Sequence, residues 1–235
     1  MNLKDRLIVA LDVREFDEMK TWVEELSPWV GCFKIGLELM TSIGAPTVVN
    51  WIHQAGGKVF LDGKFHDIPH TIKAASQAAA HLGVQMFNVH ASSGKEAMLQ
   101  AQAVKKNSLL LAVTILTSMN EEMCQEIYQG SIQQKVTELA LQAQACGVDG
   151  LICSADDLSF LNQEPTLHSL LKITPGIRPT WAAQNDQKRC LTPRQALLAG
   201  ASAIVIGRPI TQPPQSIGSR RDAACRVLEE MGGVL

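Results

Sequence analysis

The chain has 235 residues, of which 46% are hydrophobic, so it can bury one full-sized core but would be cramped as two ordinary domains. Its formal net charge of −2 provides no basic surface of the kind that binds nucleic acid, so we expect no nucleic-acid partner. Only 5% of the residues are aromatic, and this composition favours helices packed around a β core over a β-sandwich.

We expect neither a targeting signal nor a membrane partner. The N-terminus is charged from Lys4 onward and leads directly into a strand-like run, unlike a signal peptide. The longest apolar run, residues 109–116, is far shorter than the roughly 20 residues that a membrane-spanning helix needs. Six cysteines without a Cys-x-x-Cys pair are typical of reduced thiols and not of a disulfide framework or a zinc site. These features together predict a cytoplasmic protein.

Eight short apolar runs alternate with amphipathic helical segments along the chain. The predicted strands are residues 7–13, 32–39, 59–65, 86–90, 109–116, 150–154, 172–177 and 203–208. The predicted helices are residues 16–26, 45–55, 72–82, 95–104, 131–146, 192–199 and 220–231. The strands are hydrophobic along nearly their whole length, which indicates that both faces are covered, as in a parallel sheet wrapped by helices.

Eight strand–helix units predict a single (β/α)₈ barrel, a TIM barrel, formed as one catalytic domain by residues 1–235. A doubly wound open sheet is the alternative, although such a sheet usually has fewer strands at this length. Glycines at positions 56, 57, 83, 147 and 200 stand where helices should stop. Thr192 followed by Pro193 has the pattern of a helix start.

Polar and charged side chains occur at the predicted strand ends, where barrels of this type carry their functional sites. In chain order they are Asp12, Lys34, Asp62, Lys64, His90, Thr117, Ser118, Ser154, Arg178, Gly207 and Arg208. Charges within apolar strands are costly unless they pair or function. A structural ion-pair network is one interpretation, but four charges from the first three strands, directed to one mouth, favour a functional site.

Asp62 and Lys64 are two residues apart, so a regular strand would direct both to the same side. Alternating acids and bases can all stay charged despite burial, because an opposite neighbour offsets the cost of desolvation. An ammonium held among carboxylates is suited to donating a proton to a carbanion. It is poorly suited to forming a Schiff base, which needs a neutral amine.

The seventh and eighth strands predict an anion site. Arg178 follows the seventh strand and Gly207 with Arg208 follows the eighth, where barrels commonly bind phosphate through backbone N–H groups. The glycine would let the backbone approach the ligand, and the arginine would supply a planar, two-pronged donor.

His66 and His70 lie close in sequence to carboxylates, which raises the question of a metal site. The two histidines are four residues apart, but Pro69 between them argues against a regular helix that presents both on one face. Lys64 would also repel a cation. We therefore predict no metal site.

Residues 62–71, Asp-Gly-Lys-Phe-His-Asp-Ile-Pro-His-Thr, resemble the D-x-K-x-x-D-I-P-x-T signature of the orotidine 5′-phosphate decarboxylase family. Further similarity to this family occurs at residues 10–12, 33–36, 89–91, 116–119, 174–179, 185–189 and 206–211. Gly63 and His70 depart from the usual pattern, in which Leu and Asn are common at these positions. Strand alternation turns residue 63 toward the helix layer, so we expect Gly63 to weaken packing and not the chemistry.

The resemblance implies a homodimer that converts orotidine 5′-monophosphate to uridine 5′-monophosphate, the last step of pyrimidine nucleotide synthesis, without a cofactor. It implies that Lys64 donates a proton to the carbon that loses carbon dioxide, that Asp62 lies beside the substrate carboxylate, and that Lys34 and Asp67 complete the charge array. The implied substrate contacts include Lys34 and Asp62, with Asp12 at a ribose hydroxyl and Thr117 at the pyrimidine edge. The resemblance further implies that Gln187, Gly207 and Arg208 bind the phosphate beside Arg178. It also implies that the neighbouring subunit contributes Asp67, Ile68 and Thr71.

Two other functions are compatible with parts of the pattern. A magnesium-dependent decarboxylase or aldolase acting on a sugar phosphate shares D-x-K-x-x-D, but such relatives place an acidic metal ligand where this chain has Lys34. A catalytically silent phosphate-binding barrel would gain nothing from the carboxylates of Asp12, Asp62 and Asp67.

Overall fold

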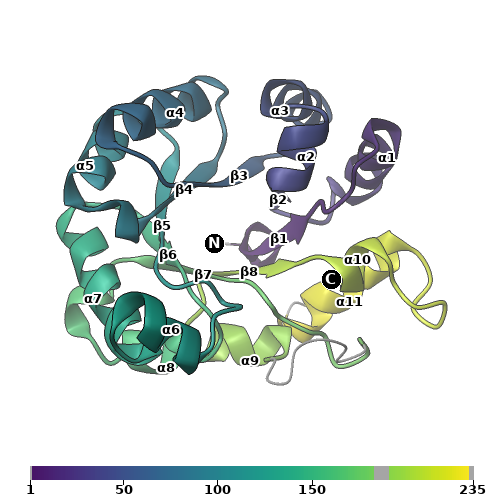
Figure 1. Cartoon of the computed structure of the whole chain (residues 1–235). Coiled ribbons are helices and arrows are strands. Elements are labelled where there is room, and N and C mark those ends of the chain that lie inside the picture. Colours follow the sequence, from purple (N-terminus) through teal and green to yellow (C-terminus); the bar gives the residue numbers. More distant parts are fainter. Residues whose placement is uncertain (1, 183–190, 233–235) are drawn as a thin grey trace. The chain divides into compact units, whose positions relative to one another are not determined.

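The computed structural model describes residues 2–182 and 191–232. Its eight strands follow one another in sequence order around a closed parallel barrel (Figure 1). The (β/α)₈ prediction is thereby confirmed, and the open-sheet alternative is wrong. The strands are β1 (Leu7–Ala10), β2 (Cys32–Ile35), β3 (Val59–Phe65), β4 (Met86–His90), β5 (Leu109–Val113), β6 (Gly150–Ile152), β7 (Leu171–Thr174) and β8 (Ala203–Ile206).

Helices follow the strands along the chain. The α-helices are α1 (Phe16–Leu26), α2 (Leu37–Ser42), α3 (Ala45–Gln54), α4 (Pro69–His81), α5 (Lys95–Val104), α6 (Glu121–Tyr128), α7 (Ile132–Ala145), α8 (Asp157–Leu161), α9 (Pro193–Leu198), α10 (Arg208–Thr211) and α11 (Arg220–Glu230). Three short 3-10 helices are η1 (Leu3–Arg6), η2 (Ala91–Ser93) and η3 (Pro165–Leu167).

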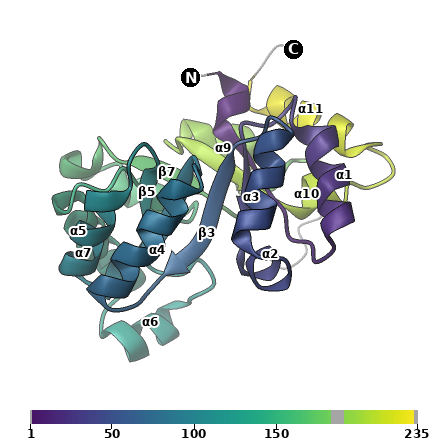
Figure 2. The same cartoon turned by 90° about the horizontal axis from the view of Figure 1, so that it is seen from above.

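The chain comprises two compact units, residues 1–63 with 174–235 and residues 64–173. In the first unit, α1 packs against α3 and α11, and α10 packs against α11. In the second unit, α4, α5 and α7 lie side by side (Figure 2), and α7 also contacts α6 and α8. Within the described residues, no helix is long and apolar enough to span a membrane.

The first unit is built on two fully buried strands, β1 and β8, which pair in parallel with Leu7 opposite Ile204 and Val9 opposite Ile206. The segment before β1 strengthens this pairing. The guanidinium of Arg6, in η1, donates hydrogen bonds to the carbonyl oxygens of Ala201 (2.6 Å) and Ser202 (2.9 Å), just before β8 begins. The start of the chain is thus tied directly to its last strand.

Strongly periodic helices lie where the sequence predicts them. Helix α1 has the predicted bounds because its buried residues Met19, Trp22, Val23 and Leu26 are three or four apart and form one apolar face. Helix α9 begins as expected, since the Thr192 side chain forms a capping box with Gln195. The glycines predicted to stop helices have positive φ angles at positions 56, 83, 147 and 200, whereas Gly57 does not.

Short elements differ from the prediction. The apolar run 32–39 is not one strand: β2 ends at Ile35 and α2 begins at Leu37, because a run of this length does not distinguish a strand from a buried helix turn. The run 203–208 likewise ends as a strand at Ile206, and Arg208 begins the short helix α10. Helices α6 and α8 were not predicted.

Helix α4 begins at Pro69, three residues earlier than predicted. Proline is favoured at the first position of a helix, where its missing N–H would have no partner within the helix. Pro69 therefore marks the start of α4, and the prediction that no regular helix presents both His66 and His70 is confirmed. The two residues are separated because His70 lies in α4 whereas His66 precedes it.

Candidate functional site

Three charged side chains of the first unit meet at the ends of β1, β2 and β3. The register places Ala10 opposite Lys34 and Lys34 opposite Phe60. Asp12 lies two residues beyond Ala10, and Asp62 lies two residues beyond Phe60. Strand alternation therefore directs both aspartates to the face that carries Lys34. The Lys34 ammonium accordingly lies 3.5 Å from Asp12 Oδ1 and 3.3 Å from Asp62 Oδ2. The structure thus brings together three of the predicted site residues.

The three side chains differ in their access to solvent. Those of Lys34 and Asp62 are 14% and 11% exposed, whereas that of Asp12 is 59% exposed. The Lys34 ammonium offsets the cost of burying the Asp62 carboxylate, because opposite charges attract more strongly where solvent is excluded. Asp12 retains an exposed carboxylate oxygen surface that can accept hydrogen bonds from a ligand.

One of the predicted anion-binding residues, Gly207, lies close to this cluster. A Cβ atom at Gly207 would lie 3.5 Å from Asp12 Oδ2, so the β8–α10 junction is adjacent to Asp12. Because it has no Cβ atom, Gly207 leaves open space beside Asp12. Arg208 is exposed at the start of α10, and Arg178 is partly buried after β7. Gln187 lies outside the described residues.

Lys64 belongs to the second unit and departs from regular strand geometry. Its φ of 47° falls in the left-handed region, which residues other than glycine seldom adopt. The regular strand conformation on which the predicted common direction of Asp62 and Lys64 depends is therefore interrupted at Lys64. The Lys64 backbone N–H donates a 2.7 Å hydrogen bond to Oδ1 of Asn88, a fully buried residue of β4.

Residues that follow Lys64 are exposed. Asp67 is exposed and its Oδ1 accepts a 2.7 Å hydrogen bond from the Ile68 N–H. Ile68 is 66% exposed, an unusual state for a large apolar side chain. Thr71 is exposed in the first turn of α4. The rings of His66 and His90 stack with centroids 5.1 Å apart.

The remaining predicted residues of the second unit have different surroundings. Strand β5 ends at Val113, so the exposed Thr117 lies in the segment that leads to α6. The Ser154 N–H donates a 2.7 Å hydrogen bond to Asp157 Oδ2, and the Ser154 hydroxyl accepts one from the Asp157 N–H. Burial raises the pKa of the Asp157 carboxyl above its usual value. Ser154 thus forms a local turn with Asp157.

Our sequence reasoning missed Asn88 and Asp157. Both are buried polar residues, Asn88 in the middle of β4 and Asp157 at the start of α8, and buried polar groups must find hydrogen-bond partners. An Asn within the apolar run 86–90 was therefore a signal, although it did not reveal its partner. Among the described residues, no group of three or more His, Cys, Asp or Glu side chains is placed to hold a metal ion.

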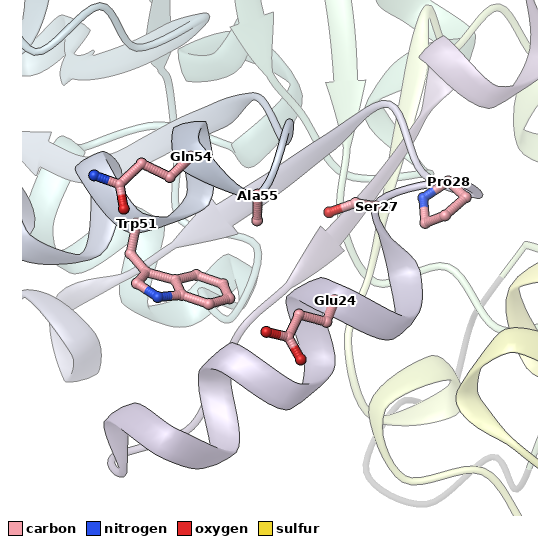
Figure 3. Close-up of a pocket in the computed structure, with 6 residues that line it drawn as sticks. All are labelled: Glu24, Ser27, Pro28, Trp51, Gln54 and Ala55. Atoms are coloured by element: carbon pink, nitrogen blue, oxygen red, sulfur yellow. The ribbon is translucent and has the colours of Figure 1, made fainter.

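A surface groove of about 400 Å³ lies in the first unit, away from the charged cluster (Figure 3). Its lining residues are Glu24, Ser27, Pro28, Trp51, Gln54 and Ala55. These residues lie at or just after the C-terminal ends of α1 and α3, which precede β2 and β3. The groove therefore lies near the N-terminal ends of these two strands, opposite the end near Asp12. It contains none of the predicted site residues, and we assign it no part in the site.

The fold and the charged cluster define the protein as a (β/α)₈ barrel of the class that carries a polar site at the ends of its strands. The sequence profile of the orotidine 5′-phosphate decarboxylase / HUMPS family matches residues 5–218, and the chain belongs to this family.

Relatives match over nearly the full length. The orotidine 5′-phosphate decarboxylase of Syntrophomonas wolfei is 40% identical over 243 residues, which cover 98% of this chain and 99% of the relative. That of Geotalea daltonii is 43% identical over 217 residues, with 89% and 90% covered. The crystal structure of orotidine 5′-phosphate decarboxylase from Lactobacillus acidophilus is similar with a TM-score of 0.82 at 31% identity, and the match covers 97% of this chain and 99% of that one.

Proposed function

We propose that this protein decarboxylates orotidine 5′-monophosphate to uridine 5′-monophosphate without a cofactor, as one catalytic domain formed by the whole barrel. The observation that carries the proposal is the Lys34 ammonium held 3.3 Å from Asp62 and 3.5 Å from Asp12 beside Gly207. The proposal is supported by relatives named orotidine 5′-phosphate decarboxylase that align along nearly the entire chain.

The reaction breaks the bond between the pyrimidine ring and its carboxylate. The bonding electrons stay on the ring carbon as a carbanion, carbon dioxide departs, and the Lys64 ammonium donates the proton that replaces it. Water then returns a proton to Lys64. The carbanion charge develops only as the bond breaks, so a fixed ammonium stabilises the transition state more than the bound substrate and raises kcat.

The proposed role of Asp62 is to lie beside the substrate carboxylate. Two unit charges about 4 Å apart repel by about 4 kcal/mol at an effective dielectric constant of about 20, and this repulsion disappears as carbon dioxide leaves. The Lys34 ammonium, 3.3 Å from Asp62, offsets the cost of burying the Asp62 carboxylate in this role. Asp67 completes the charge array.

Other residues bind the parts of the substrate that do not react. Asp12 is proposed to accept a hydrogen bond from a ribose hydroxyl, for which its exposed carboxylate is suited. Thr117 is proposed to contact the pyrimidine edge. The proposed phosphate ligands are Arg178, Gln187, Gly207 and Arg208.

We further propose that the functional unit is a cytoplasmic homodimer in which Asp67, Ile68 and Thr71 reach the partner's active site. The 66% exposure of Ile68 supports this arrangement, since a partner subunit would remove its apolar surface from water. Exposed Leu116 and Met123 on the second unit offer further apolar area.

The test is the change in ultraviolet absorbance when orotidine 5′-monophosphate is added to protein that has been exhaustively treated with a chelator. We expect full turnover without added metal. Loss of turnover that magnesium restores would favour the sugar-phosphate enzyme instead, although the Lys34 ammonium beside Asp12 and Asp62 disfavours a cation there.

Lys64→Ala should lower kcat at least about 100-fold, because it removes the stabilising charge and the proton donor. The matched control is Lys106→Ala, which also replaces a lysine with a left-handed backbone (φ 51°) but at an exposed position after α5. Similar kcat values for both variants would contradict the role of Lys64.

A further inference from the structure

Lys64 has a backbone conformation that needs external support. Its φ of 47° is disfavoured for a residue with a Cβ atom, and it occurs at the sixth of the seven residues of β3. Strain of this kind persists only when surrounding structure over-determines it. The Lys64 backbone is restrained by a 2.7 Å hydrogen bond from its N–H to Asn88 Oδ1.

Asn88 is a rigid partner for that bond. It is 0% exposed, at the centre of β4, and it lies opposite Leu111 in the pairing of β4 with β5. Its neighbours Phe87 and Val89 are also fully buried. The side-chain amide therefore has little freedom to move away from Lys64, because close-packed interiors hold their side chains in single rotamers.

Residues on either side of Asn88 hold the chain that follows Lys64. The Phe65 ring packs on the Phe87 ring with centroids 6.2 Å apart, and the His66 ring stacks on His90. Strand alternation places Asn88 and His90 on one face of β4 and Phe87 on the other. The end of β3 is thus held from both faces, with Asn88 acting on the backbone of Lys64.

We infer that Asn88 is a positioning residue that fixes the left-handed backbone of Lys64 and thereby the direction in which its ammonium points. This inference rests on the proposed role of Lys64 as proton donor. Asn88 acts through Lys64 and need not touch the substrate. A neutral amide oxygen accepts the N–H without placing a further buried negative charge next to the ammonium.

The test compares Asn88→Ala, which removes the acceptor, with Asn88→Asp, which retains an oxygen in the same place. The matched control is Val89→Ala, which truncates the adjacent buried residue on the opposite face of β4. For decarboxylation of orotidine 5′-monophosphate, Asn88→Ala should lower kcat about 10- to 100-fold, as small misplacements of a reacting group do, and leave KM within about threefold.

Asn88→Asp should recover part of the lost kcat because it keeps the acceptor oxygen, but its buried negative charge should lower the Tm. Val89→Ala should lower the Tm at least as much as Asn88→Ala but leave kcat unchanged. If Asn88→Ala and Val89→Ala lower kcat equally, or if Asn88→Ala keeps the wild-type kcat, the positioning role is wrong.

A second measurement does not depend on activity. Hydrogen exchange of the Lys64 backbone amide, followed by NMR, should be at least about tenfold faster in Asn88→Ala relative to the Leu111 amide, and near the wild-type rate in Asn88→Asp. Wild-type protein that does not turn over the substrate would refute the proposed function alone. Unchanged Lys64 exchange in Asn88→Ala would overturn the positioning contact whatever the activity.

Discussion

The shielded ion pair of Lys34 and Asp62 should be coupled much more strongly than an exposed pair with a shorter distance. The perturbations are Lys34→Met, which keeps the length of the side chain, Asp62→Asn, which keeps its shape, and the double substitution. At 3.3 Å and an effective dielectric constant of about 20, the Coulomb attraction is about 5 kcal/mol. Solvent that reaches the partly exposed side chains and relaxation of the single variants reduce this value, so we expect a coupling energy of about 1–3 kcal/mol.

Arg14 and Glu38 provide the matched control within the same unit. Their charged atoms are closer, at 2.8 Å, but the side chains are 80% and 41% exposed. Solvent then reduces the attraction, and exposed pairs of this kind contribute at most about 0.5–1 kcal/mol. The comparison therefore separates the effect of burial from the effect of distance.

The assay is urea unfolding of the wild type, the single variants and the double variant for each pair, which gives the free energy of unfolding. Other contacts of Asp62 cancel in the cycle, because they are lost equally with and without Lys34. A coupling energy for Lys34 and Asp62 no larger than that for Arg14 and Glu38 would refute the argument that solvent exclusion stabilises the cluster.

Three further predictions concern phosphate binding, subunit sharing and pH. Arg208→Ala should lower kcat/KM about 10- to 100-fold, the equivalent of one charged hydrogen-bonding group, and added guanidinium should restore part of it; equal loss with an unphosphorylated substrate would contradict phosphate binding. Refolding Lys64→Ala together with Asp67→Asn should recover about a quarter of wild-type activity, because random mixing makes half of the dimers mixed and each mixed dimer has one intact site. If proven mixed dimers recover no activity, Asp67 acts in its own subunit's site. Burial raises the pKa of Asp157 above its unfolded value, so its contribution to stability is greatest at acidic pH and is lost as the pH rises through the folded-state pKa. In urea unfolding from about pH 4 to 7, the free energy of unfolding of Asp157→Asn should therefore rise relative to that of the wild type. A difference that stays constant over this range would contradict the prediction.

The barrel could be predicted because its signals are local and repeated. Strands β3 and β4 and helices α1 and α5 have the predicted bounds, since each has a clear periodicity and a sharp end. Helices α2 and α10 could not be separated from the strands before them, because both continue an apolar run for less than two turns.

The charged cluster was partly predictable for the same reason. Alternation along regular strands correctly places Asp12 and Asp62 on the face of Lys34. Lys64 departs from the regular strand conformation that this reasoning assumes, and its backbone N–H donates a hydrogen bond to a residue 24 positions later in the chain. No pattern local to residues 62–66 contains that information, and so Asn88 could not be linked to Lys64 from the sequence.

The hydrogen bonds from Arg6 to the carbonyls before β8 have a practical consequence for protein engineering. Through these hydrogen bonds, η1 anchors the segment that precedes β8, the strand that leads to Gly207 and Arg208. A deletion or a bulky fusion at residues 2–6 would disturb the hydrogen bonds of Arg6. Its effect would reach the proposed phosphate ligands, although they lie about 200 residues away in sequence. Affinity tags for this barrel therefore belong at the C-terminal end of the chain, or behind a linker long enough to leave η1 folded.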